Sequence, residues 1–209
     1  LANPRLATLW GLPPELMSSN PHIDQIAVAA GQIAEAMGGR LVAGDPDHYV
    51  TGFSIDTRTL AAGDLFFAIV AARDGHDFVA VAAKRRAAGL VVSRPVTLGD
   101  ENDAFVIEVA DTTRALQDLA RYVRRQSGAT VIAITGSAGK TTTKDTIAEL
   151  LSTRVSVVKN TGNLNNHLGL PLSLLELRRG ADVAVMELGM NHAGEIRTLV
   201  GVAEPEIRV

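Results

Sequence analysis

The sequence predicts an α/β fold in which parallel sheets are covered by helices, arranged as a small α/β first domain and part of a second. Apolar runs typical of buried strands alternate with amphipathic helical stretches along most of the chain. A glycine-rich turn joins the apolar run at residues 131–134 to a helical stretch at 141–151, which is typical of a parallel sheet with a ligand-binding edge. The pair Ser127-Gly128 breaks the pattern just before that run, and we place the domain boundary there.

Residues 1–21 are rich in Pro, Ser and Asn and are expected to form a loose leader ahead of the first domain, residues 22–127. Pro21 opens a helical pattern whose apolar face continues to Met37 and ends at Gly38-Gly39. The other elements expected in this domain are strand patterns within 50–70 around a turn at 62–64, a helix at 77–88 ended by Gly89, strands at 90–92 and 105–109, and a helix at 112–125.

The second domain, residues 128–209, begins with the apolar strand and the glycine-rich turn. Behind them we expect a helix at 141–151, a strand at 155–158, an Asn/Gly loop, a helix ending near Leu177 and a strand at 183–186. Residues 205–209 resemble the start of another strand. Three clear strands are too few for a complete domain of this class, so we expect the rest of it to be absent.

Composition narrows the class of protein. With 46% hydrophobic and 21% charged residues the chain is typical of a globular protein, and a net charge of -3 without a basic, aromatic-interleaved stripe argues against a nucleic-acid partner. The absence of cysteine excludes disulfides and thiolate metal sites. No apolar run approaches the roughly 18 residues of a membrane span, and no signal pattern is present, so we expect a cytoplasmic protein with no membrane partner.

Residues 135–142, Thr-Gly-Ser-Ala-Gly-Lys-Thr-Thr, predict a phosphate-binding loop. Gly136 and Gly139 allow backbone N–H groups to converge on one anion, and a helix starting near Lys140 adds its positive dipole end. The Lys140 ammonium suits the β- and γ-phosphates, and the Thr141 hydroxyl suits Mg²⁺. Ile134 stands where the usual pattern has a glycine, and the alternative is an ordinary glycine-rich turn. We predict ATP or GTP binding through Gly136, Ser137, Ala138, Gly139, Lys140, Thr141 and Thr142.

Polar residues at the ends of other predicted strands are candidates for the same site. Glu187 follows a buried strand 47 residues after Lys140, which suits a carboxylate on Mg²⁺, although a solvated strand end is the alternative. Four asparagines lie within residues 160–166, where a turn or a helix N-cap at Asn165 or Asn166 is the structural explanation. This loop also follows a strand, so we expect it at the carboxyl edge of the sheet.

In the first domain, residues 54–58 and 74–78 concentrate hydrogen-bonding groups at the ends of elements. Helix caps and surface turns explain them as well as ligand binding does, and His76 taken alone favours a structural role. The sequence contains no Ser/His/Asp triad pattern and no His-rich metal spacing.

Together these motifs resemble the Mur ligases, the ATP-dependent amide-forming enzymes of peptidoglycan precursor synthesis. The resemblance runs from about residue 22 to Val209. The first half of the chain resembles the family's uridine-nucleotide-binding domain. The second half resembles the family's own phosphate loop, which also lacks the leading glycine. One branch of the family is matched in particular by the later motifs. The segments that carry the resemblance are 54–58, 62–66, 74–76, 135–142, 162–166, 169–172 and 187–196. His167 stands where many members have an acidic residue.

The resemblance implies a reaction and its cofactors. ATP would phosphorylate the terminal carboxylate of a UDP-muramoyl-tripeptide, and the amine of D-Ala-D-Ala would attack the acyl phosphate. Lys140 would hold the phosphates, Thr141 and Glu187 would position Mg²⁺, and Asn165 or Asn166 would orient phosphate or metal. Near the UDP moiety we expect Ser54, Thr57, Arg58 and His76.

The resemblance also implies parts that this chain does not contain. A metal-binding histidine, a carbamoylated lysine and a third domain are expected beyond Val209, so we expect this chain, as a monomer, to bind ligands without turnover. Two alternatives stay open: another Mur-type ligase that adds a single amino acid or builds polyglutamate, and a nucleotide-binding module without ligase chemistry. Whether the third peptide residue is diaminopimelate or lysine is also open.

Overall fold

The computed structural model describes residues 28–98, 103–190 and 194–209. These residues form two compact units that divide between Tyr122 and Val123, inside helix α4 (Thr112–Ser127). Each unit is built around its own sheet. The expected leader lies outside the described residues, and the functional division of the chain after residue 127 stays a prediction.

The first unit contains a five-stranded sheet in the order β1-β5-β4-β3-β2. Its strands are β1 (Arg40–Ala43), β2 (Gly52–Ser54), β3 (Asp64–Phe67), β4 (Gly89–Val92) and β5 (Phe105–Glu108). All neighbours pair in parallel except β1, which runs antiparallel to β5. Strand β1 was not predicted, because its four residues are mostly exposed and show no apolar alternation.

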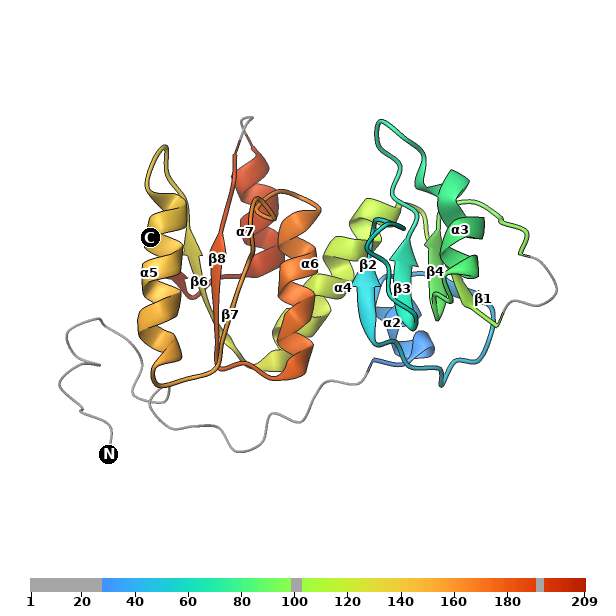
Figure 1. Cartoon of the computed structure of the whole chain (residues 1–209), viewed down its shortest axis with the longest axis horizontal. Helices are drawn as coiled ribbons and strands as arrows, with labels where there is room; N and C mark the ends of the chain where they lie inside the picture. The colour runs from blue at the N-terminus through green and yellow to red at the C-terminus, as the bar shows by residue number, and fades with distance from the viewer. Residues whose placement is uncertain (1–27, 99–102, 191–193) are drawn as a thin grey trace. The chain divides into compact units, whose positions relative to one another are not determined.

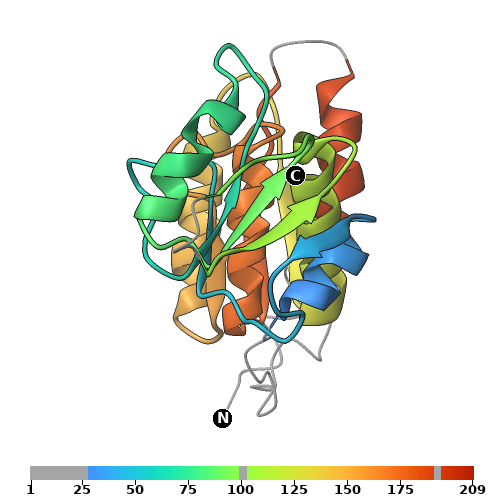
Figure 2. The same cartoon turned by 90° about the vertical axis from the view of Figure 1, so that its right-hand side faces the viewer.

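Helices α2 (Ala30–Ala36) and α3 (Val79–Lys84) lie on opposite faces of this sheet, and α3 is preceded by the 3-10 turn η2 (Gly75–Phe78) (Figure 2). Successive strand side chains point to opposite faces, so each strand supplies two layers of core. Phe66 and Leu90 pack with Val79 and Ala82 of α3 in one of these layers. Both faces are therefore buried, as the apolar runs predicted.

Two predicted helices have different bounds in the structure. The helix expected from Pro21 begins at Ala30, because Ala29 is extended and bridges to Tyr49; its predicted residues before Val28 lie outside the described part. The helix expected to reach residue 88 ends at Lys84. Arg86 adopts a left-handed φ of 64°, and Gly89 starts β4 instead of capping a helix. The turn after Lys84 was not predicted from the sequence, because the alanines around it favour a continuous helix.

The second unit is a four-stranded, wholly parallel sheet in the order β7-β8-β6-β9. Its strands are β6 (Thr130–Ile134), β7 (Val157–Lys159), β8 (Val183–Glu187) and β9 (Ile207–Arg208). Helix α5 (Lys140–Ser152) covers one face, and α6 (Gly169–Leu175) and α7 (Glu195–Ala203) cover the other (Figure 1). Helix α6 continues as the 3-10 turn η3 (Glu176–Arg179). The predicted α/β fold with parallel sheets is confirmed.

The register of this sheet determines where its loops meet. Ile134 at the end of β6 pairs with Glu187 at the end of β8, and β7 joins β8 in parallel. The loops that follow β6, β7 and β8 therefore lie at the same carboxyl edge, toward the top of Figure 1. The strand expected near residues 205–209 is present as β9, whereas α7 was not predicted. Among the helices of the described ranges, none is long and apolar enough to span a membrane.

Candidate functional site

The glycine-rich turn lies between β6 and α5 at this edge. Gly136 and Gly139 have φ values of 150° and 79°, which only glycine adopts readily, and α5 begins immediately afterwards at Lys140. The Lys140 Nζ atom donates to the Gly136 carbonyl at 2.8 Å, so the lysine side chain folds back over the turn. A turn of this shape presents backbone N–H groups, a helix N-terminus and one ammonium group to an anion.

Glu187 meets the first turn of α5 across the sheet edge. Glu187 is buried, with 4% of its surface exposed, and both of its carboxylate oxygens accept hydrogen bonds. Thr141 Oγ1 donates to Oε2 at 2.7 Å, and Asn165 Nδ2 donates to Oε1 at 2.9 Å. Three predicted site residues from three separate segments are thus in direct contact. Their hydroxyl, carboxylate and amide oxygens are the hard donors that Mg²⁺ prefers in proteins.

Asn166 makes its hydrogen bonds to backbone groups, unlike the Asn165 side chain, which donates to the Glu187 carboxylate. Asn166 Oδ1 accepts hydrogen bonds from the backbone N–H groups of Leu168, at 3.1 Å, and Gly169, at 2.8 Å, where α6 begins. This is the capping role that the sequence left open for either asparagine. Asn166 and His167 also line a hollow of about 100 Å³ that reaches Thr198 on α7.

Asn160 and Gly189 lie in segments that the sequence marks as candidates, but neither was predicted as a site residue. Lys144, which donates to the Asn160 carbonyl, was missed. Asn160 is 1% exposed, and its side chain is hydrogen-bonded to the backbone of Glu187. A Cβ atom on Gly189 would lie 2.6 Å from Asn165 Oδ1, so the glycine lets that asparagine approach. A polar residue directly after a strand was the available signal for Asn160, but one sequence does not show which strand-end residues turn inward.

The described parts of the chain contain no group of three or more His, Asp or Glu side chains arranged to hold a metal ion by themselves. A magnesium ion bound with a nucleotide does not need one, because it takes one or two carboxylates and fills its other positions with phosphate oxygens and water. The Thr141 and Glu187 oxygens beside the glycine-rich turn therefore have the chemistry to fit Mg²⁺ in company with a nucleotide.

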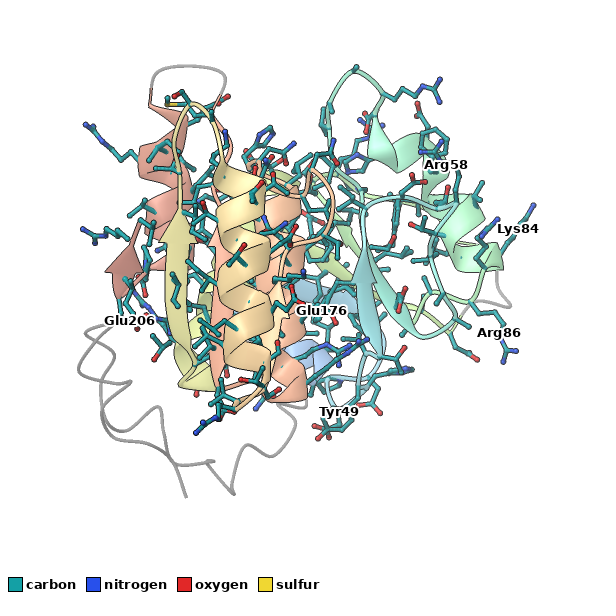
Figure 3. All side chains as sticks on the ribbon, turned by 60° about the vertical axis from the view of Figure 1, so that its left-hand side comes forward. Tyr49, Arg58, Lys84, Arg86, Glu176 and Glu206 are labelled. Carbon is teal, nitrogen blue, oxygen red and sulfur yellow. The ribbon has the colours of Figure 1, made fainter. Side chains whose placement is uncertain are left out.

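The expected substrate residues of the first unit lie at the carboxyl edge of its parallel strands: Ser54 ends β2, Thr57 and Arg58 follow it, and His76 lies after β3. Ser54 is buried, and its hydroxyl donates to the Asp56 carbonyl at 3.0 Å, closing a turn. Arg58 lies at the surface (Figure 3), where its guanidinium contacts the Asp56 carboxylate at 2.5 to 3.0 Å. The side-chain hydrogen bond from Arg58, followed by that from its backbone N–H, lowers the pKa of Asp56 to about 2. Thr57 is half-buried between them.

His76 is held inside the unit. Its side chain is 2% exposed, Ser93 N–H donates to Nε2 at 2.9 Å, and Nδ1 lies 2.6 Å from Asp74 Oδ1. Because Nε2 accepts, we assign the ring proton to Nδ1. The backbone N–H and then the ring of His76, followed by Arg94, lower the pKa of Asp74 to about 2. His76 thus joins the loops after β3 and β4, and no hydrogen bond between described residues links it to Ser54 or Arg58.

Comparison with known proteins agrees with this geometry. Residues 134–209 match the Mur ligase middle domain. A UDP-N-acetylmuramoyl-tripeptide--D-alanyl-D-alanine ligase of Bacillus subtilis is 42% identical over 181 residues, which cover 85% of this chain and 39% of the relative. The chain therefore spans about two fifths of the length of the curated relatives it matches.

Solved structures show the same similarity. A MurF structure from Acinetobacter baumannii matches with a TM-score of 0.79 at 37% identity, over 87% of this chain and 40% of that one. The MurF ligase of Thermotoga maritima, in complex with ADP, matches with a TM-score of 0.65 at 34% identity, over 74% of this chain and 35% of that one.

Proposed function

This chain belongs to the Mur ligase family, and from that premise we propose that it carries part of a UDP-N-acetylmuramoyl-tripeptide–D-alanyl-D-alanine ligase. The observation that carries the proposal is the contact of Thr141 and Asn165 with the Glu187 carboxylate beside the phosphate-binding turn. The relatives that match both units bear this ligase name, which supports the same activity here.

The proposed reaction has two steps. The terminal carboxylate of the tripeptide attacks the γ-phosphorus of ATP, and ADP leaves as an acyl phosphate forms. The amine of D-Ala-D-Ala then attacks the acyl carbon, loses a proton and displaces inorganic phosphate, which leaves a new amide bond. Neither step requires a protein nucleophile, so positioning and electrostatic stabilisation provide the rate acceleration.

The second unit provides the groups that such phosphoryl transfer needs. Lys140 and the backbone N–H groups from Gly136 onward hold the phosphates and stabilise the charge that develops on them. Thr141 and Glu187 would hold Mg²⁺, and Asn165 orients the carboxylate. When bound, the ion neutralises negative charge on the phosphate oxygens. Asn166 contributes through the start of α6, which it caps.

The first unit is proposed to bind the UDP moiety at the carboxyl edge of β2 and β3. Thr57 and Arg58 are the residues accessible for direct contact, and the Arg58 guanidinium suits a diphosphate. Ser54 and His76 shape the two loops from within. We propose that the protein acts as a monomer in the cytoplasm, where ATP and the nucleotide precursor are present.

Calorimetric titration of this chain with UDP-muramoyl-tripeptide, with free UDP as the comparison, tests the proposal. Saturable binding that is tighter than UDP binding supports a muramoyl-peptide site. A parallel titration with ADP and Mg²⁺ tests the second unit, with Lys140→Ala as the variant expected to lose affinity. Binding of MgADP without any binding of the UDP-tripeptide favours a nucleotide-binding module and contradicts the ligase. In the full-length protein, faster product formation with a single amino acid than with D-Ala-D-Ala contradicts the assigned branch.

A further inference from the structure

Asn160 extends the parallel ladder of the second unit with its side chain. The backbone pairing of β7 with β8 ends at Lys159 and Val185. Two residues further along β8, Asn160 Oδ1 accepts from the Glu187 N–H at 3.0 Å, and Asn160 Nδ2 donates to the Glu187 carbonyl at 2.9 Å. The side-chain amide therefore takes the place of a neighbouring peptide group. Buried backbone groups need such partners, and Glu187 is buried.

The same amide also fixes the loop that reaches the Glu187 carboxylate. Asn160 Nδ2 donates to the Leu164 carbonyl at 2.9 Å, one residue before Asn165. Asn165 Nδ2 then donates to Glu187 Oε1 at 2.9 Å. Asn160 thus holds both the backbone of the carboxylate residue and the loop that supplies its amide partner.

Lys144 holds Asn160 from the helix side. Its side chain is 3% exposed, and its Nζ donates to the Asn160 carbonyl at 2.9 Å and lies 3.6 Å from Asp145 Oδ1. Lys144 is one helical turn after Thr141 on α5, so the helix that carries the hydroxyl is tied to the end of β7. A buried ammonium group is unfavourable without such partners, so this contact resists rearrangement.

We propose that Asn160, held by Lys144, is a positioning residue that sets the Glu187 carboxylate against the Thr141 hydroxyl. The inference rests on the proposed function, because it is for a magnesium-bound nucleotide that the carboxylate is positioned. A purely structural role for Asn160 predicts lower stability with an unchanged response to Mg²⁺. A positioning role predicts that the response to Mg²⁺ itself falls.

The test is calorimetric binding of ADP, with Mg²⁺ and with EDTA, to the wild-type chain and its variants. Asn160→Leu has nearly the same volume and no hydrogen bonds, and we expect it to reduce the Mg²⁺-dependent gain in affinity at least tenfold. Affinity in EDTA should stay within twofold, which also shows that the variant is folded. Lys144→Met should also reduce this Mg²⁺-dependent gain in affinity, by a smaller factor than Asn160→Leu does. Asn163→Ala, at an exposed asparagine of the same loop, is the matched control and should equal wild type.

If Mg²⁺ raises the ADP affinity of Asn160→Leu as much as it raises that of the wild-type chain, the proposal is overturned. If that variant does not fold, Asn160→Asp decides, since it keeps an acceptor for Glu187 N–H but has no donor for the two carbonyls. If the wild-type chain shows no Mg²⁺-dependent binding, the proposed function fails, and hydrogen exchange still tests the positioning. The Glu187 amide should then exchange at least tenfold faster in Asn160→Leu, which has no acceptor for it, than in Asn163→Ala, and equal rates would contradict the inference.

Discussion

Adding a methyl group at position 189 tests how closely the carboxyl edge of the second unit is packed. Gly189 follows β8, and an ideal Cβ atom there would lie 2.6 Å from Asn165 Oδ1 and 2.7 Å from its Cγ. Real Cβ atoms do not approach so closely, so Gly189→Ala displaces the Asn165 side chain. The backbone of Gly189 has no left-handed φ, and the change is therefore steric alone.

The structure gives the size of the expected effect. Displacing Asn165 breaks its 2.9 Å hydrogen bond to Glu187 Oε1. Hydrogen bonds to charged groups contribute about 1.5–3 kcal/mol, which corresponds to a loss of about 10- to 150-fold in affinity if the carboxylate must be reset on binding. We expect the loss in MgADP affinity and not in the affinity for ADP measured in EDTA.

Calorimetry of both ligands checks this prediction, with Gly201→Ala as the matched control. A Cβ atom on Gly201, in α7, meets no atom within 4 Å, so this variant should bind like wild type. Adding Gly189→Ala to Asn165→Ala should cause little further loss, because both changes remove one interaction. Wild-type MgADP affinity in Gly189→Ala would refute the reasoning, and so would an equal loss in EDTA.

Three other predictions concern single interactions. Lys140→Ala should weaken nucleotide binding about tenfold or more in calorimetry, since it removes a charge-assisted hydrogen bond, while thermal unfolding stays near wild type because the side chain contacts only the turn's own carbonyl among described residues. Arg124→Met should lower the free energy of unfolding by about 1–3 kcal/mol in urea titrations, because the buried guanidinium binds the Ala203 and Glu204 carbonyls at the end of α7 and the Glu206 carboxylate. The Asp56 carboxyl should titrate by NMR with a pKa of about 2, below the ordinary 3.8, and Arg58→Ala should return this pKa toward 3.8. Since the folded pKa is the lower one, the contact of Asp56 with Arg58 stabilises the fold fully above pH 3.8. That stabilisation is lost as the pH falls through 2.

Much of the fold was predicted from patterns of residues close together in the sequence. The alternation of apolar strands and amphipathic helices predicted the α/β class, because burial on a sheet and on a helix face requires different periodicities. The turn between β6 and α5 was predicted because Gly136 and Gly139 suit backbone conformations that few other residues adopt, and the structure places them there. Strand β1 and helix α7 were missed, the first because it is short and exposed and the second because polar and glycine residues precede it.

The sequence by itself determined the class of fold, the glycine-rich turn between β6 and α5 and the candidacy of Glu187, because each depends on residues close together in the chain. Only the tertiary structure decided that Asn165 contacts Glu187 whereas Asn166 caps α6, and that Asn160 and Lys144 turn inward beneath them. These choices depend on the register of β6, β7 and β8. A hydrogen bond forms only when two groups lie within about 3 Å, and that distance is set by the packing of separate strands.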